Sequence, residues 1–368
     1  MIIEIRAKNC YVFEDEITFS MKADMRNKKF ASNVHKENNF NVLKTAGVYG
    51  ANNSGKTCLV KCIRAIKNIL LNKKSDLMPN IFSDSDICEL GVTFMALGRK
   101  FVFDFGYDAK KKEYVYESFV EILKDQHNNE KKVCWFKKDT ENNMYECVDE
   151  AVIDTMLIIA KDNLFYHLID TRKFSTLANM KKILIGFAEK IDIINMNNIP
   201  MEHTIELMKN KNKLQEKVVE FIKNADLYMD DFEYVDMDKI LVKSGEEDEK
   251  SEEKVLNIPE QILDQIRLIS TYKGHKVPSM LFDSTGTKKI AALASYVIEG
   301  IEQGRILVVD ELDSSIHFKL TRAIVAMFNN ELNTDAQMIF TVHDINLMDC
   351  KRIFRKEQIW FVHKNQKG

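Results

Sequence analysis

The chain has 368 residues, of which 45% are apolar and 30% are charged, and its formal net charge is −3. This composition is typical of a globular protein with a large core, and it excludes the disordered and fibrous classes. The small net charge does not indicate a polyanion ligand, although one face of the protein can still be basic.

The cysteines and the apolar runs disfavour two further classes. Seven cysteines are scattered without a C-x-x-C pair, which favours reduced thiols in a cytoplasmic protein over disulfides or a zinc site. No apolar run approaches the roughly 18 residues needed to span a bilayer, and Glu4 and Arg6 interrupt the N-terminal segment. The sequence therefore predicts neither a signal peptide nor a membrane partner.

The first elements in chain order predict the setting of a phosphate-binding loop. Alternating apolar and polar residues predict two short strands within 1–20, and a polar connection from Lys22 to Asn41 follows. Leu43–Tyr49 then predicts a strand that leads into a glycine-rich loop, and Cys58–Leu71 predicts a helix. A phosphate loop requires strand, loop and helix in this order.

The middle of the chain changes character twice. Aromatic and β-branched residues with period-two spacing predict an antiparallel β block over 90–136, and the pattern becomes helical from Asp149 to Leu227. Within it, Met201–Met229 predicts an amphipathic helix lying on a domain. A coiled-coil arm is the alternative, although sustained heptads are missing. The acidic run 245–254 predicts a solvated, mobile loop, with a functional acidic tail as the other interpretation.

The last third returns to an α/β pattern. Both ends of the chain therefore predict one nucleotide-binding head of the α/β class, a mixed sheet with flanking helices plus an antiparallel β block, around an inserted helical lobe. The expected divisions are 1–150 and 262–368 for the two halves of the head and 151–261 for the lobe. The predicted C-terminal elements are helices Lys289–Ile301 and Phe318–Asn329 and strands Arg305–Val309, Gln337–Val342 and Gln358–Val362.

A complete G-x-x-x-x-G-K-[ST] run marks the loop after the strand Leu43–Tyr49. Its glycines allow successive backbone N–H groups to face a β-phosphate, and the helix that starts near Lys56 adds its positive dipole end. Lys56 would bridge the β- and γ-phosphates, and the Thr57 hydroxyl would bind Mg²⁺. A chance loop before a helix is the alternative. The predicted ATP-binding residues are Gly50, Asn52, Asn53, Ser54, Gly55, Lys56, Thr57 and Cys58.

Two further strand ends carry candidate catalytic groups. The aliphatic run Ile306–Val309 is typical of a buried central strand, and it ends in Asp310 and Glu311. Asp310 would hold Mg²⁺ and Glu311 would polarise the attacking water, although an Asp-Glu pair often only ends a strand. His343 follows the next predicted strand, where an imidazole can sense a γ-phosphate; a lone histidine is more often structural.

A polar segment at a helix start is the fourth candidate. Ser284, Gly286 and Thr287 can form an anion cradle from backbone amides, hydroxyls and the helix dipole. An ordinary N-cap is the competing interpretation. The position of the segment, one helix before Asp310 and Glu311, favours the cradle.

In this order, the motifs resemble the ABC-type ATPase heads of the SMC and OLD group, and in particular compact bacterial AAA-family ATP-binding proteins. The shared motifs are Y-G-A-N-x-S-G-K at Tyr49–Lys56, S-x-G-T-x-K at Ser284–Lys289 and D-E-[IL]-D-x-S-[IL]-H at Asp310–His317. The resemblance covers roughly 1–120 and 265–363. It departs from the family at Cys10 and Tyr11, where an aromatic and a basic residue are usual. It departs again at Phe318, which replaces proline, and no Q-loop glutamine is found between 90 and 130.

The resemblance implies an ABC-type P-loop NTPase head that hydrolyses ATP and dimerises head to tail on Mg-ATP. Ser284, Gly286 and Thr287 of one copy would contact the γ-phosphate bound to the other, and Asp313 would lie at the seam. It also implies a partner effector, such as a nuclease, in phage defence or abortive infection, with nucleic-acid binding left open. An SMC-like DNA-repair or DNA-maintenance ATPase is the alternative, against which the missing heptad arms argue. An ABC transporter ATPase is the third candidate, against which the degenerate signature argues.

Overall fold

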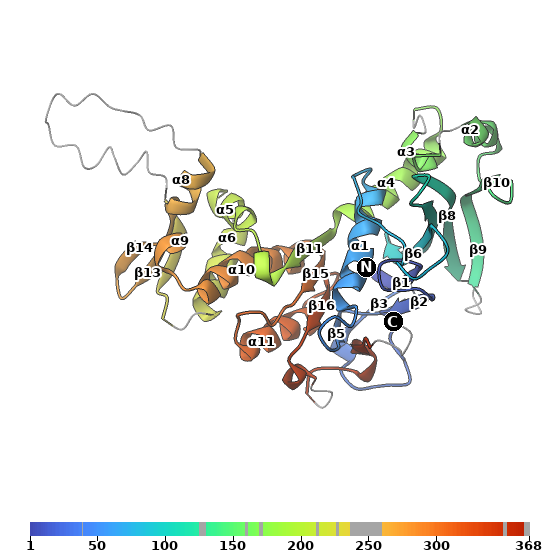
Figure 1. The fold of residues 1–368 in the computed structure, drawn as a ribbon. Helices are drawn as coiled ribbons and strands as arrows, with labels where there is room; N and C mark the ends of the chain where they lie inside the picture. The colour runs from blue at the N-terminus through green and yellow to red at the C-terminus, as the bar shows by residue number, and fades with distance from the viewer. Residues whose placement is uncertain are drawn as a thin grey trace, which may run out of the picture.

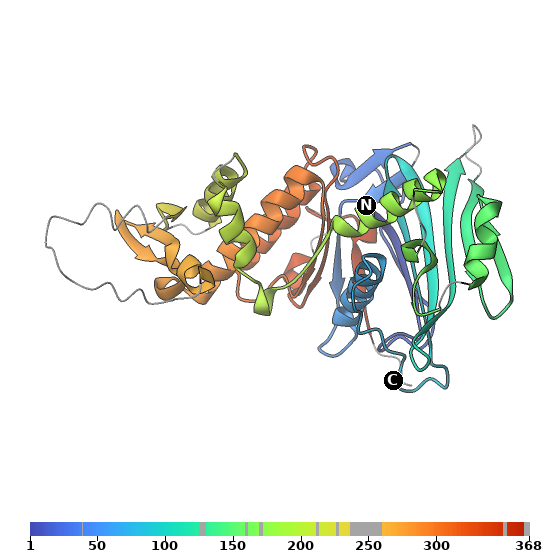
Figure 2. The ribbon, with the colours of Figure 1, turned by 90° about the horizontal axis from the view of Figure 1, so that it is seen from above.

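The structure is a computed structural model that describes residues 1–38, 40–124, 130–158, 161–168, 172–210, 213–225, 228–235, 260–348 and 352–363. The molecule is elongated, with an antiparallel sheet at one end, a parallel sheet in the middle and a mainly helical lobe at the other end (Figures 1 and 2). The predicted α/β class, with an antiparallel β block and a helical lobe, is confirmed, and the central sheet of the head is parallel.

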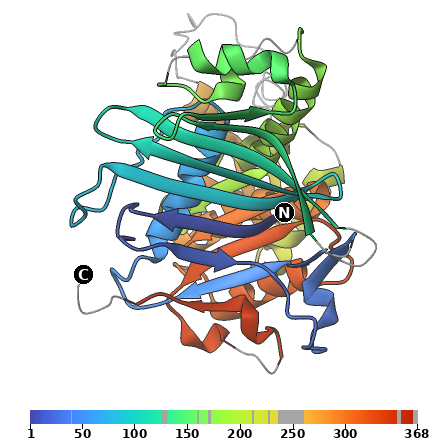
Figure 3. The ribbon, with the colours of Figure 1, turned by 90° about the vertical axis from the view of Figure 1, so that its right-hand side faces the viewer.

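The antiparallel sheet buries one face and leaves the other more polar, as the alternation along its strands predicts. Phe101, Phe103 and Phe105 lie on the buried face. The strand order is β10-β9-β8-β7-β6-β1-β2 (Figure 3). The strands are β1 (Ile2–Lys8), β2 (Ile17–Ser20), β6 (Ile87–Ala96), β7 (Arg99–Asp108), β8 (Glu113–Lys124), β9 (Glu130–Asp139) and β10 (Met144–Cys147).

A small hairpin lies where the sequence predicts only a polar connection between Lys22 and Asn41. Its strands are β3 (Val34–Glu37) and β4 (Phe40–Leu43). Val34 and Val42 are buried in the main core, so tertiary burial stabilises strands too short to be recognised from their own pattern.

The parallel sheet carries the predicted nucleotide-binding elements. Its order is β11-β15-β16-β5-β17, and every neighbouring pair is parallel. The carboxyl ends of its strands therefore meet at one edge, which is where open α/β sheets bind ligands. The strands are β5 (Thr45–Tyr49), β11 (Ile191–Asn195), β15 (Ile306–Asp310), β16 (Gln337–Val342) and β17 (Ile359–Phe361).

Helices cover both faces of the parallel sheet. Strand side chains alternate, so Ile306 and Val308 of β15 join the core formed with the antiparallel sheet, whereas Leu307 and Val309 join the core on the opposite face. The first core contains α1 (Lys56–Leu70) and α4 (Ser175–Glu189), and the second contains α10 (Thr285–Gln303) and α11 (Phe318–Asn329). The short helices α2 (Ile153–Ile158) and α3 (Phe165–Leu168) lie beside the antiparallel sheet.

The lobe is built on the outer part of α10. Residues 201–229, predicted as one helix, form α5 (Glu202–Lys209) and α6 (Lys213–Ala225), which share an apolar core with α10. This packing agrees with a helical segment lying on a domain and not with a projecting arm. The remaining elements are α8 (Glu260–Arg267), α9 (Ser279–Phe282), β12 (Asp231–Tyr234), β13 (Leu268–Tyr272) and β14 (His275–Pro278).

One predicted region needs correction. The stretch from Asp149 to Leu227 is not helical throughout, because β11 interrupts it and pairs with β15 in register from Ile191 to Asn195. β11 thus lies in the sheet of the head although its residues fall within the range 151–261. The acidic run 245–254 lies outside the described residues. None of the described helices is long and apolar enough to cross a membrane.

Candidate active site

The glycine-rich loop leaves β5 at the carboxyl edge of the parallel sheet and enters α1, which begins at Lys56. Asn53 (φ 60°) and Gly55 (φ 110°) both adopt left-handed backbone conformations, which turn the chain sharply into the helix. A Cβ on Gly50 would lie 2.3 Å from the carbonyl oxygen of Val362. Glycine is therefore required at this position by the close approach of the C-terminal segment.

Two buried polar side chains of this loop point to a ligand. Lys56, 6% exposed, donates from Nζ to the carbonyl oxygens of Gly50 (2.7 Å) and Ala51 (3.0 Å). Burial lowers the pKa of Lys56, and the nearby carboxylates, led by Glu311, act in the opposite direction. The Oγ of Ser54 is buried without a hydrogen-bond partner among the described residues. An acceptor oxygen such as that of a phosphate would satisfy it.

Asp310 ends β15 and receives hydrogen bonds from three other elements. Its Oδ1 accepts from Thr341 Oγ1 at 2.6 Å and from Thr57 Oγ1 at 3.4 Å, while its Oδ2 accepts from Asn195 Nδ2 at 3.1 Å. The Thr57 and Asp310 oxygens lie side by side, and such hard oxygens suit Mg²⁺, which needs only one or two protein ligands beside phosphate and water. Among the described residues, no group of three or more His, Cys, Asp or Glu forms a fuller metal site.

Glu311 and His343 are held at the same edge. The backbone of Glu311 adopts the left-handed conformation (φ 58°), and its N–H donates to Thr341 Oγ1 at 2.8 Å. Asp313 Oδ2 accepts the backbone N–H groups of His343 and Asp344, each at 2.8 Å, so the two strand-end loops are tied together. The Nδ1 of His343 lies 3.4 Å from Lys56 Nζ. The structure thus brings together the predicted site residues that follow β5, β15 and β16.

The predicted cradle contacts the loop that follows Glu311. Ser284 is the N-cap of α10, and its Oγ accepts the backbone N–H of Thr287 at 3.1 Å. A Cβ on Gly286 would lie 3.2 Å from the carbonyl oxygen of Ser315, and Lys289 Nζ donates to Ser315 Oγ at 3.0 Å. An ordinary cap is therefore present, and the role of these residues toward a second copy stays a prediction.

A pocket of about 740 Å³ adjoins the phosphate loop and was missed by sequence reasoning. Ser54 and Cys58 form its border with the loop, and its walls are largely apolar and aromatic. These walls come from distant segments, so no local pattern announces them. Typical wall residues are Val12, Phe13, Met78, Phe82, Trp360 and Phe361.

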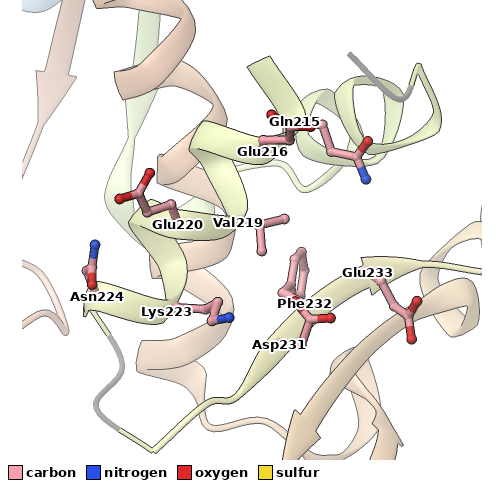
Figure 4. A pocket seen from close by; sticks show the side chains of 9 residues that line it. All are labelled: Gln215, Glu216, Val219, Glu220, Lys223, Asn224, Asp231, Phe232 and Glu233. Atoms are coloured by element: carbon pink, nitrogen blue, oxygen red, sulfur yellow. The ribbon is translucent and has the colours of Figure 1, made fainter. Parts of the chain in front are cut away.

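A separate groove of about 430 Å³ lies on the lobe between α6 and β12 (Figure 4). Its lining carries four carboxylates and one lysine, which disfavours an anionic ligand such as a nucleotide. The carboxylates belong to Glu216, Glu220, Asp231 and Glu233, and the lysine is Lys223.

One known family profile is similar to part of the chain. Residues 189–349 match a family profile described as "AAA domain, putative AbiEii toxin, Type IV TA system". This range includes Asp310, Glu311, His343 and the cradle, and it begins just before β11. No curated protein sequence matches the chain significantly.

Several solved structures align with most of the chain at low sequence identity. They include the SMC head domain from Thermotoga maritima (10% identity, TM-score 0.42, 95% of this chain and 92% of that chain covered). A SmcHead bound to the C-winged helix domain of ScpA shows 12% identity and a TM-score of 0.47, and the match covers 94% of this chain and 91% of that chain. An Smc head with an extended coiled coil, bound to the C-terminal domain of ScpA derived from Pyrococcus furiosus, shows 11% identity and a TM-score of 0.41. The match covers 94% of this chain and 90% of that chain. At these identities and scores the likeness supports no statement about function.

Proposed function

We propose that the chain binds Mg-ATP at the Gly50–Thr57 loop and hydrolyses it in a site completed by a second copy bound head to tail. One observation supports the proposal most strongly: the side chains of the phosphate loop and of two strand ends lie together at one edge of the sheet. They are Lys56, Thr57, Asp310, Glu311 and the loop at His343. A strand-end aspartate beside a phosphate-loop threonine and a second carboxylate next to it are the groups that phosphoryl transfer to water needs.

Each residue has a role that follows from its contacts. Lys56 would exchange its bonds to the loop carbonyls for bonds to phosphate oxygens, and Ser54 Oγ would gain the partner it lacks. Mg²⁺, held by Thr57 and Asp310, would neutralise phosphate charge. Glu311 would accept the proton of the attacking water, and His343 would contact the γ-phosphate.

The pocket beside the loop supports a nucleoside as the rest of the ligand. Its volume of about 740 Å³ lies in the usual range for small-molecule sites. Its apolar and aromatic walls suit a heterocyclic base, and Ser54 joins it directly to the phosphate loop. The base of ATP would therefore lie between the segment at Val12–Phe13 and Trp360.

The surface around the cradle supports a second copy as its partner. Leu281 and Phe282, immediately before the cradle, are 69% and 68% exposed, and Ser284 and Thr285 are exposed as well. Neighbouring exposed apolar side chains mark surfaces that another molecule covers. A second copy that places its phosphate loop here would cover them.

The biological setting of the proposal is regulation of an effector, such as a nuclease, in phage defence. It is supported by the matched profile, whose description names an AbiEii toxin of a type IV toxin–antitoxin system. The six cysteines among the described residues are free thiols, which fits the reducing cytoplasm.

Glu311→Gln tests the proposed function. The variant keeps the size and polarity of the side chain but cannot accept the proton, so it should bind Mg-ATP, hydrolyse it at only a small residual rate and accumulate as a dimer in light scattering. The double variant with Lys56→Ala should remain monomeric under the same conditions. A monomer at saturating Mg-ATP would show that the head-to-tail arrangement is wrong.

A further inference from the structure

Two asparagines outside every predicted motif lie against the catalytic carboxylates. The parallel register of β11 and β15 places Asn195 directly opposite Asp310. Asn195 Oδ1 accepts the backbone N–H of Asn197 at 2.8 Å and caps a short 3-10 turn, Met196–Asn198. The side chain of Asn197, two residues after Asn195, contacts the loop that follows β15.

Asn197 bonds this loop at two points. Its Nδ2 donates to Oε2 of Glu311, and its Oδ1 accepts from the hydroxyl of Ser314 at 2.6 Å. Each polar atom of the amide is therefore used, and only one orientation of the amide allows both bonds. Glu311 itself is half-exposed, and its backbone is fixed in the left-handed region by the bond from its N–H to Thr341.

We propose that Asn197 is a positioning residue that fixes the rotamer of the Glu311 carboxylate for its work on the attacking water. The proposal rests on the proposed function, because Glu311 is the water-activating group there. A glutamate side chain has three torsions, so an unrestrained carboxylate at a half-exposed site samples many orientations. Because Asn197 bonds Oε2, Oε1 would be the oxygen left for the attacking water. Orientation within a fraction of an ångström is what such a group needs to be effective.

The chemistry of the pair suits this role. A neutral amide donates one directed hydrogen bond to the carboxylate and brings no opposite charge beside it. A lysine or arginine in this place would instead form an ion pair with the carboxylate and weaken its tendency to accept a proton. The bond from Ser314 keeps the amide oxygen of Asn197 turned away from Glu311. A flipped amide would place that oxygen against the carboxylate, and the two would repel each other.

The test compares four variants by the turnover rate and by the affinity for ATP. Asn197→Ala should lower kcat about tenfold to hundredfold, since a hydrogen bond to a charged group is lost, with little change in the dissociation constant for ATP. Asn197→Asp has the same shape but repels Glu311, so its loss should be at least as large. Asn197→Gln retains the amide and should recover part of the rate. Asn198→Ala, at the exposed neighbouring position, is the matched control and should behave as wild type.

A double variant separates positioning from a structural role. If Asn197 acts through the Glu311 carboxylate, adding Asn197→Ala to Glu311→Gln should reduce the residual rate by less than twofold. An Asp variant as active as wild type, or a full additional loss in the Glu311→Gln background, would overturn the inference. If wild type and Asn198→Ala hydrolyse no ATP, the proposed function fails instead, so the two failures are distinguishable.

Discussion

Thr341 is the residue that holds Asp310 and Glu311 in place, and Thr341→Val removes its hydroxyl while keeping its shape. Thr341 is 1% exposed on β16, between the phosphate-loop strand and the Asp310 strand. Its Oγ1 donates to Asp310 Oδ1 at 2.6 Å and accepts the backbone N–H of Glu311 at 2.8 Å. A single hydroxyl thus bonds both the carboxylate of Asp310 and the backbone of Glu311.

The cost of the substitution follows from these two bonds. Loss of a hydrogen bond to a charged group costs about 1.5–3 kcal/mol, and a buried N–H left without a partner adds about 1–3 kcal/mol. Partial relaxation reduces the sum, so we expect destabilisation of about 3 kcal/mol. The rate of ATP hydrolysis should fall as well, because the left-handed turn at Glu311 loses its support.

Urea unfolding followed by circular dichroism measures the change in stability, and the chain contains a matched control. Thr321 on α11 is also 1% exposed, and its Oγ1 has no hydrogen-bond partner among the described residues. Thr321→Val removes a buried hydroxyl that makes no bond, so it should be neutral or slightly stabilising. Equal unfolding midpoints for Thr341→Val and Thr321→Val, with unchanged hydrolysis, would refute the reasoning.

Two further predictions concern charge. Lys56→Ala should weaken ATP binding at least about thirtyfold, since a buried charge that faces phosphate is lost; equilibrium binding that matches wild type would contradict this. Burial raises the pKa of Glu117 to about 7, against the opposing effects of Lys138 and the Phe165 N–H. The folded state then binds the proton more tightly than the unfolded chain, so stability should fall by about 3 kcal/mol between pH 4.5 and 7. Glu117→Gln should remove that slope in urea titrations, and an unchanged slope would show that another group causes it.

Local pattern predicts most of the head. The strand before the phosphate loop, the helix after it and the aliphatic strand ending in Asp310 have strong periodicity or composition, and each lies within two residues of its predicted bounds. Helix α11 and strand β16 have the predicted bounds. Buried strands of this kind depend on apolar content that the sequence shows directly.

What the sequence does not reveal depends on contacts between distant segments. β11 is five residues long and lies between helices, so its strand character comes from pairing with β15, more than a hundred positions later. Asn195 and Asn197 were missed for the same reason, because only the register of that pair brings them to Asp310 and Glu311. Asn195 ends β11 and Asn197 lies in the turn that follows it, so the carboxylates receive these bonds from a strand that the sequence pattern does not reveal.

The central claim is that one ATP site is shared between two copies, and mixing two inactive variants tests it most directly. Lys56→Ala disables the phosphate loop, and Gly286→Asp places a negative charge in the cradle, next to Ser315. In a mixed dimer, one composite site combines an intact loop with an intact cradle, while the other carries both lesions. We predict that ATP hydrolysis, absent from each variant alone, reappears on mixing and is greatest near equal amounts. Hydrolysis that stays at background at every ratio, with mixed dimers shown to form, would contradict a shared site and leave Ser284–Thr287 as a helix cap.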